Sequence, residues 1–370
     1  MPSVAIIGTR GYPSYYGGFE TAVRQLAPYL AEQGWDVLVY GRDGSTVEDD
    51  PNRDERVRTR KTHGLESKSL STLSYGLTAS LDATLRKPDV ALVMNVANGF
   101  WLPLLKARGI PVLTNVDGIE WDRDKWGAAA KFMFKSGAKL TARYSNGLVY
   151  DAEAIADRWR RDFGREGFFI PYGGDEPAIG PVEPGLERRK YVMVVARFVP
   201  ENTIPEFFSA VAEIARTRDV IIVGSSGYQG ELDDWAQRLD DEHPRVQWLG
   251  HVKDDRRLHA LWQHAGAYFH GHSVGGTNPA LVQAMACGAP TVARDTVFNR
   301  EVLGEHGVFV RPEPTEIAAA IEDLIQDPAQ QEVLSDGVRG RAAESYTWDL
   351  VNSKYERALL RAIKLNPSSR

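Results

Sequence analysis

The segment His270–Gly288 combines residue types that can hold an anionic ligand. Asn278 is a favourable N-cap and Pro279 suits the first helical position, so the sequence predicts a helix that begins here and ends at the segment's last glycine. Free backbone N–H groups at a helix start favour phosphate. Gly275 and Gly276 precede the cap and let the backbone approach such a ligand closely. We therefore predict a phosphate-binding loop, with an ordinary capped crossover helix as the alternative.

Two polar residues extend this candidate site. Thr277 stands between the glycines and the cap, and Gln283 lies one turn inside the predicted helix. Helical side chains lean toward the N-terminus, so we expect the Gln283 amide to reach the same ligand. An amide offers one acceptor and one donor group, whereas a carboxylate can accept from two hydroxyls at once.

The histidines of this segment do not indicate a metal site. His270 and His272 stand two residues apart at a strand end, and we expect them to point to opposite faces, with His272 toward the ligand and His270 in the core. The single cysteine, Cys287, excludes an internal disulfide and a cysteine-rich metal site, and we interpret it as a core residue.

Charged residues follow two other predicted strands. Arg197 ends a buried strand, where a guanidinium can neutralise phosphate, with a surface salt bridge as the alternative. Asp117 also follows a strand, and its carboxylate is suited to orienting or partly deprotonating a hydroxyl. The alternative is that Asp117 caps the following helix. Glu120 is the second candidate for the same role.

The elements that must position these residues alternate between strands and helices. Val4–Gly8, a Gly-rich loop, a helix over Phe19–Gln33 and a strand over Trp35–Tyr40 form the unit of a parallel doubly wound sheet. Further strands are expected at 90–94, 111–115, 147–150 and 168–171. After a Gly/Pro-rich linker at 173–185 the pattern restarts, with strands at 191–196, 219–224, 246–250, 267–270 and 290–293. The sequence predicts two α/β domains, over 1–177 and 186–347, facing each other across a cleft.

Composition fits a globular protein of this size. The chain has 370 residues with 43% hydrophobic and 25% charged residues, enough for two domains. The net charge of -6 comes from the C-terminal half, because charges balance over residues 1–177, and this argues against nucleic-acid binding. The N-terminus resembles a strand rather than a signal peptide, and no apolar run reaches the roughly 20 residues of a membrane span. We expect a cytoplasmic protein.

The His270–Pro279 motif resembles glycosyltransferase family 4, and within it bacterial rhamnosyltransferases. Other segments look like the same subgroup, namely Ile7–Pro13, Tyr16–Thr21, Val116–Trp121 and Ala196–Asn202. The resemblance spans most of the chain and implies a GT-B fold, no obligatory metal and transfer with retention at the anomeric carbon. It implies that Gly17 and Gly18 lie near the donor diphosphate and the acceptor, with a plain turn before the first helix as the alternative, and that His251 lies where the base is held. We expect His272 to touch the donor sugar. Residues 348–370 resemble a helix and tail that cross back to the first domain.

The chain departs from the wider family at charged positions. Two glutamates eight residues apart are replaced by Gly275 and Gln283, although the subgroup usually keeps the second. An Arg…Lys pair for the diphosphate is represented by Arg197 and Asn202, and the subgroup shares this asparagine. A deoxyribose has one hydroxyl fewer than ribose, so Gln283 is compatible with a dTDP donor.

The resemblance implies a nucleotide-sugar donor, dTDP-L-rhamnose, and a lipid-linked or saccharide acceptor in cell-surface polysaccharide synthesis. The rivals are a family 4 transferase using a UDP- or GDP-sugar, a GT-B sugar-nucleotide epimerase, a phosphorylase, and a silent binding protein that kept the fold. The acceptor, the linkage and the oligomeric state are not determined by the sequence.

A basic stripe in the first domain points to a second partner. Lys131, Lys135, Lys139 and Arg143 recur every four residues on a predicted helix, beside an apolar stripe of Ala130, Met133, Gly137, Leu140 and Tyr144 flanked by Phe132 and Phe134. Residues Arg56, Arg58, Arg60, Lys61 and Lys68 form a second basic region. Solvated charge is one interpretation. The other is attachment to anionic lipid at the inner face of the plasma membrane.

Overall fold

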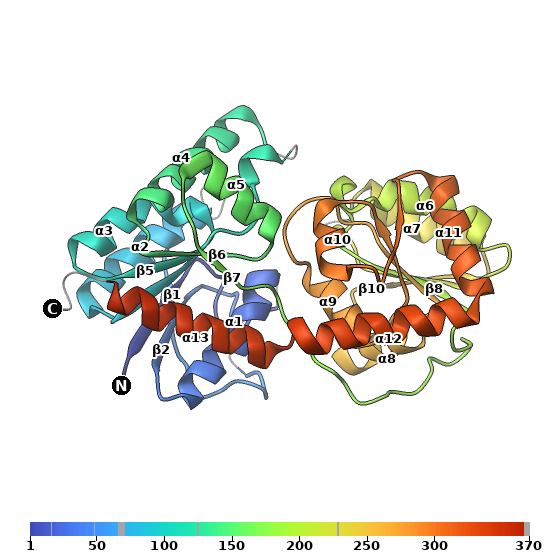
Figure 1. Cartoon of the computed structure of the whole chain (residues 1–370), viewed down its shortest axis with the longest axis horizontal. Coiled ribbons are helices and arrows are strands. Elements are labelled where there is room, and N and C mark those ends of the chain that lie inside the picture. Colours follow the sequence, from blue (N-terminus) through green and yellow to red (C-terminus); the bar gives the residue numbers. More distant parts are fainter. Residues whose placement is uncertain (16, 48, 66–70, 124–125, 228, 366–370) are drawn as a thin grey trace. The chain divides into compact units, whose positions relative to one another are not determined.

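The computed structural model describes residues 1–15, 17–47, 49–65, 71–123, 126–227 and 229–365. Tyr16 and Lys68, named above, lie outside this range. The chain forms two compact units, Met1–Tyr172 with Trp348–Arg370, and Gly173–Thr347. Each unit is a parallel sheet covered by helices, which confirms the predicted pair of α/β domains (Figure 1).

The first unit contains a seven-stranded parallel sheet in the described chain, in the order β3-β2-β1-β4-β5-β6-β7. Its strands are β1 Ser3–Ile7, β2 Asp36–Arg42, β3 Arg58–Thr62, β4 Val90–Met94, β5 Val112–Asn115, β6 Gly147–Tyr150 and β7 Phe168–Phe169. Its helices are α1 Gly18–Glu32, α2 Ser71–Arg86, α3 Leu102–Ala107, α4 Ala128–Tyr144, α5 Glu153–Phe163 and α13 Trp348–Lys364, with short 3-10 turns η1 Val96–Trp101 and η2 Glu120–Asp122.

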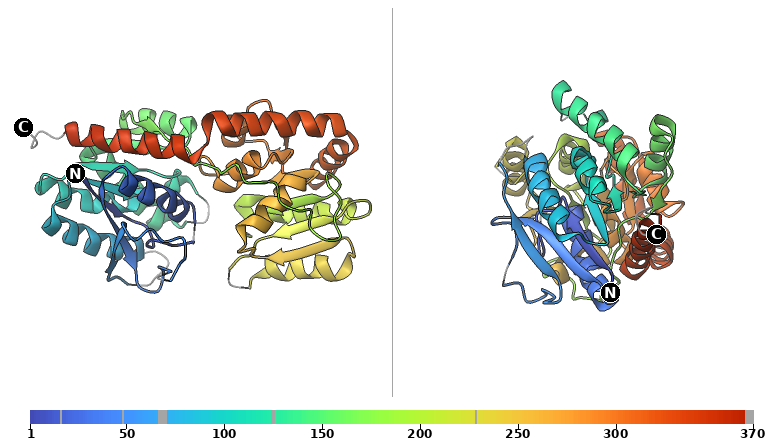
Figure 2. Two further views of the ribbon diagram at one scale, coloured as in Figure 1. Left: turned by 90° about the horizontal axis from the view of Figure 1, so that it is seen from below. Right: turned by 90° about the vertical axis from the view of Figure 1, so that its left-hand side faces the viewer.

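Alternate residues of the central strands pack on opposite faces of this sheet. Val4 and Ile6 of β1 belong to the buried cluster that includes α1 and α13, whereas Ala5 and Ile7 belong to the one that includes α2 and α3. Helix α13 therefore completes the core of the first unit, packing beside α1 (Figure 2). Trp348, the first residue of α13, is among the buried apolar side chains of this core.

The second unit repeats the arrangement with six parallel strands among the described residues, ordered β10-β9-β8-β11-β12-β13. The strands are β8 Val192–Val195, β9 Val220–Val223, β10 Val246–Gly250, β11 Ala267–His270, β12 Thr291–Arg294 and β13 Val308–Val310. The helices are α6 Ile204–Ile214, α7 Glu231–Glu242, α8 Asp255–His264, α9 Pro279–Ala286, α10 Val297–Leu303, α11 Pro314–Gln326 and α12 Pro328–Ser345, with the 3-10 turn η3 Pro200–Asn202.

Strand β3 was not predicted, because its residues Arg58–Thr62 show no apolar alternation. It is an edge strand that pairs with β2 and exposes much of its length. The basic residues of β3 and the preceding Arg56 have acidic partners: Arg58 pairs with Asp36 at 2.5 Å, and the other pairs are Arg56–Asp54, Arg60–Asp82 and Lys61–Asp43. The second basic region is therefore largely neutralised within the fold.

The predicted apolar stripe of α4 is wrong in register. The buried residues are Phe134, Gly137, Ala138 and Thr141, of which only Gly137 belonged to the predicted stripe. The reason is a close backbone contact: a Cβ on Gly137 would lie 2.4 Å from the Val96 carbonyl oxygen of η1. Gly137, Ala138 and Thr141 therefore face the core together with Phe134, whereas Met133 and Leu140 are only partly buried.

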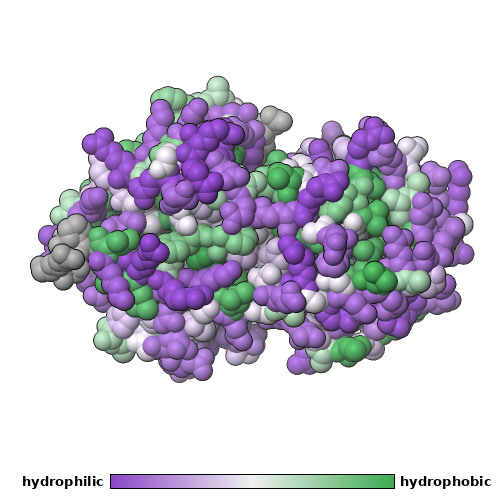
Figure 3. All heavy atoms as spheres, in the orientation of Figure 1, coloured by the Kyte–Doolittle hydropathy of each residue, from purple (hydrophilic) through white to green (hydrophobic). Residues whose placement is uncertain are grey.

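On the face drawn in Figure 3, hydrophilic side chains cover most of each unit. Within the described part of the chain, no helix has the length and hydropathy needed to cross a bilayer.

Candidate functional site

Helix α9 begins as the sequence predicts. Asn278 has extended N-cap geometry, and its Oδ1 accepts the Ala280 N–H at 2.9 Å, while Pro279 occupies the first turn. The preceding Gly275 has a φ of 103°, a conformation that favours glycine. Gly288 follows the helix with a φ of 70°. The loop and the cap together present a helix N-terminus at the carboxyl end of β11.

The start of this loop is joined to the turn that follows β8. The Ser273 N–H and Oγ both donate to the Glu201 carbonyl, at 3.0 and 2.7 Å. The Thr203 Oγ1 donates to the Gly271 carbonyl at 2.6 Å. These bonds bring the candidate residues of the two segments to one edge of the second unit's sheet, where ligands bind in α/β folds.

Arg197 and Asn202 take different positions in that turn. The Asn202 side chain is buried, and its Nδ2 donates to the Arg197 carbonyl at 2.9 Å, so this amide group holds the turn. Arg197 is exposed, and no carboxylate of the described residues lies within ion-pair distance of it. The salt-bridge alternative for Arg197 is therefore not what the fold forms.

Gln283 does not lean freely toward the α9 N-terminus. Its Oε1 accepts the Asp175 N–H at 3.0 Å, and its Nε2 donates to the Asp175 carbonyl at 2.8 Å. The same Nε2 lies 3.6 Å from Sγ of Cys287, the C-cap residue of α9. The Gln283 amide thus accepts one hydrogen bond from the backbone of Asp175 and donates another to it. Neither bond was part of the expectation that this amide reaches a ligand. A glutamate here could not make both bonds, because an ionised carboxylate only accepts.

The expectation that His270 and His272 point to opposite faces is wrong. Their rings stack at 4.5 Å between centroids and 11° between planes. Residues two apart on extended chain lie on the same side, and only neighbours alternate. His270 is buried and its Nδ1 bonds with the Tyr268 hydroxyl at 2.9 Å. Burial, followed by the neighbouring His272, lowers the pKa of His270, which therefore remains neutral.

His251 lies exposed just after β10. The preceding Gly250 has a φ of 60°, and its carbonyl accepts the Gly224 N–H at 2.7 Å. Thr277, the remaining candidate of the loop, is buried. The described residues contain no group of three or more His, Cys, Asp or Glu side chains able to hold a metal ion.

In the first unit, Asp117 follows β5 in a left-handed conformation with a φ of 59°. Asn115 Oδ1 accepts the Asp117 N–H at 2.9 Å, and Asn115 Nδ2 donates to the Tyr355 hydroxyl at 2.7 Å. The capping alternative is wrong, because Ile119 occupies the N-cap of η2. The carboxylate therefore stands on a strained residue that a hydrogen-bond chain from α13 holds in place.

Glu120 is buried, and its carboxylate has partners within the fold. Its Oε2 accepts from Trp126 Nε1 at 2.7 Å, and its Oε1 pairs with Arg123 at 2.9 Å. Each carboxylate oxygen therefore has a partner within the fold, and Glu120 remains the second candidate for binding a hydroxyl.

Gly17 is the N-cap of α1, and Gly18 is its first residue. A Cβ on Gly18 would lie 2.9 Å from the Tyr172 hydroxyl, so glycine is needed for this packing. Burial, and then the charges of Asp117 and Asp151, raise the pKa of Tyr172 well above its ordinary value. Its hydroxyl thus stays protonated beside the Asp117 carboxylate.

Sequence reasoning missed Tyr172, Tyr355 and Arg294. Tyr355 looks like an ordinary core position of an amphipathic helix, and its contact with Asn115 spans 240 residues of sequence. Arg294 ends β12 and donates to Thr203 Oγ1 at 3.0 Å. A signal was available for Arg294, since a cation that ends a strand in an α/β fold lies at the edge where ligands bind.

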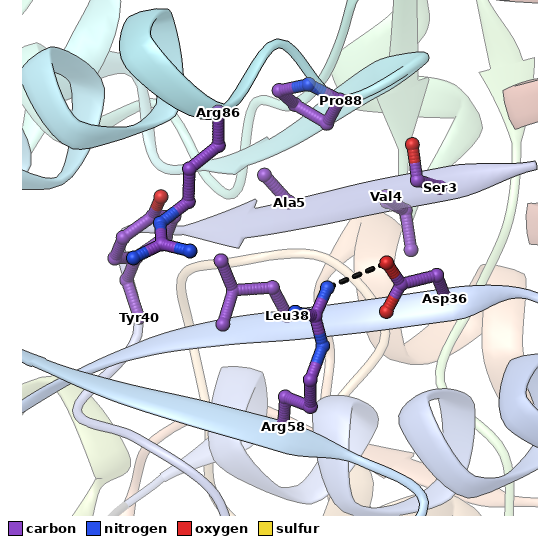
Figure 4. Close-up of a pocket in the computed structure, with 9 residues that line it drawn as sticks. All are labelled: Ser3, Val4, Ala5, Asp36, Leu38, Tyr40, Arg58, Arg86 and Pro88. Atoms are coloured by element: carbon purple, nitrogen blue, oxygen red, sulfur yellow. Dashed lines mark hydrogen bonds and ion pairs between the residues drawn. The ribbon is translucent and has the colours of Figure 1, made fainter.

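A surface hollow of about 330 Å³ lies elsewhere, beside the first residues of β1, β2 and β3 (Figure 4). The Arg58–Asp36 ion pair lies across it. None of the predicted site residues lines it.

Two family models match the chain. The one described as "Glycosyl transferase 4-like domain" matches residues 17–173, and the one described as "Glycosyl transferases group 1" matches residues 189–327. Together they cover most of both units.

Two curated relatives are mannosyltransferases. The chain is 30% identical over 167 residues to O-antigen chain mannosyltransferase B of Escherichia coli, a match that covers 43% of this chain and 42% of that protein. It is 26% identical to MMP alpha-(1->4)-mannosyltransferase of Mycolicibacterium hassiacum, over 97% of this chain and 98% of that protein. The first match thus spans less than half of its relative.

Solved structures confirm the predicted GT-B fold. Sucrose-phosphate synthase from Thermosynechococcus elongatus has a TM-score of 0.80 at 18% identity, covering 96% of this chain and 98% of that one. HepE from Anabaena, in complex with UDP, has a TM-score of 0.75 at 17% identity, covering 97% and 100%.

Proposed function

Because the chain belongs to glycosyltransferase family 4 and has the GT-B fold, we propose that it transfers L-rhamnose from dTDP-L-rhamnose to a lipid-linked or saccharide acceptor. Transfer proceeds with retention at the anomeric carbon and serves the synthesis of a cell-surface polysaccharide. No metal is required in this proposal, since protein cations and backbone N–H groups meet the diphosphate charge.

The observation that carries the choice of donor is the state of Gln283. Its amide is paired with both backbone groups of Asp175, so it is a poor partner for the two hydroxyls of a ribose. Gly275 stands at the other position where the wider family has a glutamate, and it has no side chain that could accept a hydrogen bond. Binding of a deoxyribose at such a site costs less free energy than binding of a ribose, because a deoxyribose has one hydroxyl fewer to leave without a hydrogen-bond partner.

The chemical step follows from the groups at hand. The bond between the sugar C1 and the donor phosphate oxygen breaks, and a bond from C1 to the acceptor oxygen forms on the same face. The acceptor proton passes to an oxygen of the leaving diphosphate, so the protein provides no nucleophile. Arg197 and the α9 N-terminus stabilise the charge that develops on the diphosphate, and Asp117 orients the acceptor hydroxyl.

Donor hydrolysis and transfer assays test this function directly. We expect turnover with dTDP-L-rhamnose and much slower turnover with a panel of UDP- and GDP-sugars. In parallel, Gln283→Glu is expected to weaken binding of dTDP relative to UDP, because it breaks the bond to the Asp175 carbonyl and adds a hydroxyl acceptor. A wild-type enzyme that strongly prefers UDP- over dTDP-sugars would rule out the proposed donor.

Mannosyl transfer from a GDP- or UDP-sugar is the second candidate. The observation that favours it is that both curated relatives are named mannosyltransferases. The same donor panel separates the two candidates, since only one of them predicts turnover of a nucleotide-linked mannose. An epimerase would instead change the donor without an acceptor being present.

We also propose that α4 attaches the enzyme to anionic lipid. Lys135, Lys139 and Arg143 are exposed, and none of them has a carboxylate within ion-pair distance among the residues that the structure places. Lys131 begins the stripe, and the neighbouring Phe132 is 76% exposed. Basic residues near an anionic surface contribute about 1 kcal/mol each, and an exposed aromatic ring can enter the interface.

Vesicle flotation with and without anionic lipid tests this attachment. Replacing Lys135, Lys139 and Arg143 together by Gln is expected to abolish flotation with anionic vesicles. The matched control replaces Arg58 and Arg60, which are paired with acidic residues, and is expected to float like the wild type. Equal flotation of all variants would refute the proposal.

A further inference from the structure

Arg294 is the last residue of β12 and lies at the same edge of the second unit as the α9 loop. Strand β12 pairs with β11, with Ala293 opposite His270, so Arg294 is level with the first residue of the loop. We propose that Arg294 binds the diphosphate of the donor, an inference that rests on the proposed function.

The position of its guanidinium is set by hydrogen bonds to the neighbouring strand ends. Arg294 Nη1 donates to Thr203 Oγ1 at 3.0 Å, and Thr203 Oγ1 in turn donates to the Gly271 carbonyl at 2.6 Å. The side chain thus reaches from the end of β12 past the start of the α9 loop to the turn after β8. Thr203 Oγ1 thereby links the guanidinium to the turn after β8 and to the Gly271 carbonyl after β11.

The backbone of Arg294 is fixed to the same loop. Asn299 Nδ2 donates to the carbonyls of both His272 and Arg294, at 2.9 and 2.8 Å. Asn299 is itself buried on α10, and its N–H is held by the Thr296 hydroxyl. The end of β12 therefore cannot move independently of the loop that carries the predicted phosphate site.

The charge of Arg294 is not balanced by the protein. The residue is half-buried, and within the described ranges no carboxylate comes within ion-pair distance of its guanidinium. Its neighbour Arg300, by contrast, pairs with Asp295 at 2.6 Å. A guanidinium carries five N–H donors, and among the residues that the structure describes the acceptor found for Arg294 is the neutral Thr203 hydroxyl. A half-buried cation of this kind is stabilised by an anion.

A diphosphate is the anion that fits these surroundings. The sugar and base of the donor are neutral, whereas the diphosphate carries its negative charge. Arg197 stands exposed after β8, Arg294 ends β12, and the capped start of α9 follows β11 between them. Asn202 is neutral, and its amide nitrogen is already bonded to the Arg197 carbonyl. Two guanidiniums and a helix N-terminus therefore share the charge of two phosphates.

Binding of dTDP and dTMP to four proteins tests the inference by calorimetry. They are the wild type, Arg294→Gln, Arg294→Lys and the matched control Arg300→Gln. A charge-assisted hydrogen bond lost at this site weakens dTDP binding by about tenfold to hundredfold in Arg294→Gln. We expect a smaller loss for dTMP, an intermediate loss for Arg294→Lys, and no change for Arg300→Gln. Thermal melts verify that each variant is folded.

The outcomes separate this inference from the function on which it rests. If Arg294→Gln binds dTDP within about twofold of the wild type, or weakens dTDP and dTMP equally, the role of Arg294 is refuted while the function stands. If the wild type binds UDP or GDP instead of dTDP, the comparison is made with that diphosphate and its monophosphate. A wild type that binds no nucleoside diphosphate overturns both the function and the role of Arg294.

Discussion

The hydroxyl of Tyr355 is the far end of the hydrogen-bond chain that holds Asp117. Replacing Tyr355 by Phe removes the acceptor of Asn115 Nδ2, whose bond is 2.7 Å long. Both side chains are buried, so water does not replace the lost partner. An unsatisfied buried donor costs about 1–3 kcal/mol, and we expect the free energy of unfolding to fall by that amount. For a protein of this size, each kcal/mol lowers the melting midpoint by about 2–4 °C.

The effect on activity follows from the other end of the chain. Asn115 Oδ1 holds the N–H of Asp117, whose left-handed backbone is disfavoured for a residue other than glycine. Once the Asn115 amide can turn, Asp117 relaxes and its carboxylate no longer meets the acceptor hydroxyl. A loss of about 1.4 kcal/mol of transition-state stabilisation corresponds to a tenfold fall in kcat. The KM for the donor is expected to be unchanged, because the donor is held by the second unit.

Thermal unfolding and steady-state kinetics at saturating donor measure both effects. The matched control is Tyr29→Phe, which removes a 3.3 Å bond to Glu356 from the same packing of α1 on α13. This part-exposed bond is worth about 1 kcal/mol or less, and its loss is expected to leave kcat unchanged. The reasoning is refuted if Tyr355→Phe retains wild-type kcat, or if Tyr29→Phe lowers kcat as strongly.

Three further predictions concern stability. Gly137→Ala is expected to lower the free energy of unfolding by about 1–3 kcal/mol, because its Cβ meets a carbonyl at 2.4 Å, whereas Gly340→Ala, with open space on a helix, raises it by about 1 kcal/mol. The lowered pKa of His270 means that the unfolded chain binds one more proton below about pH 6.5, so stability falls by about 1.4 kcal/mol per pH unit as pH drops below this value. His270→Asn should flatten this slope in acid-unfolding curves, and the exposed His63→Asn should retain it. Arg189→Met, measured by denaturant unfolding, should cost about 1–3 kcal/mol for each buried carbonyl left without its donor, and wild-type stability would contradict the role of this buried guanidinium.

Local patterns predicted the elements that local interactions decide. Apolar runs located the buried strands, from Val4–Gly8 to Pro290–Ala293, because both faces of a parallel sheet are covered. The Asn278-Pro279 pair located the start of α9, because a cap is satisfied within three residues of sequence. The edge strand β3 escaped this reasoning, since its residues face water and pair with a neighbour that the sequence alone does not reveal.

The functions of individual side chains depended on partners distant in sequence. Gln283 is bonded to Asp175, and Asp117 depends on Tyr355 through Asn115. None of these pairings has a periodicity from which it could be predicted.

The sequence by itself determined that this chain forms two parallel α/β domains, with a glycine-rich loop and a capped helix following β11 in the second. Hydrophobic periodicity and capping act over a few residues, so they can be recognised in any one segment. Only the tertiary structure decided which cations remain available to a ligand. The charges of Arg58 and Arg60 are neutralised by partners from other elements, whereas Arg294 ends β12 without a carboxylate partner among the described residues and donates to the Thr203 hydroxyl. Whether a charged side chain is neutralised depends on the charges close to it in space, and those neighbours are determined by the tertiary structure.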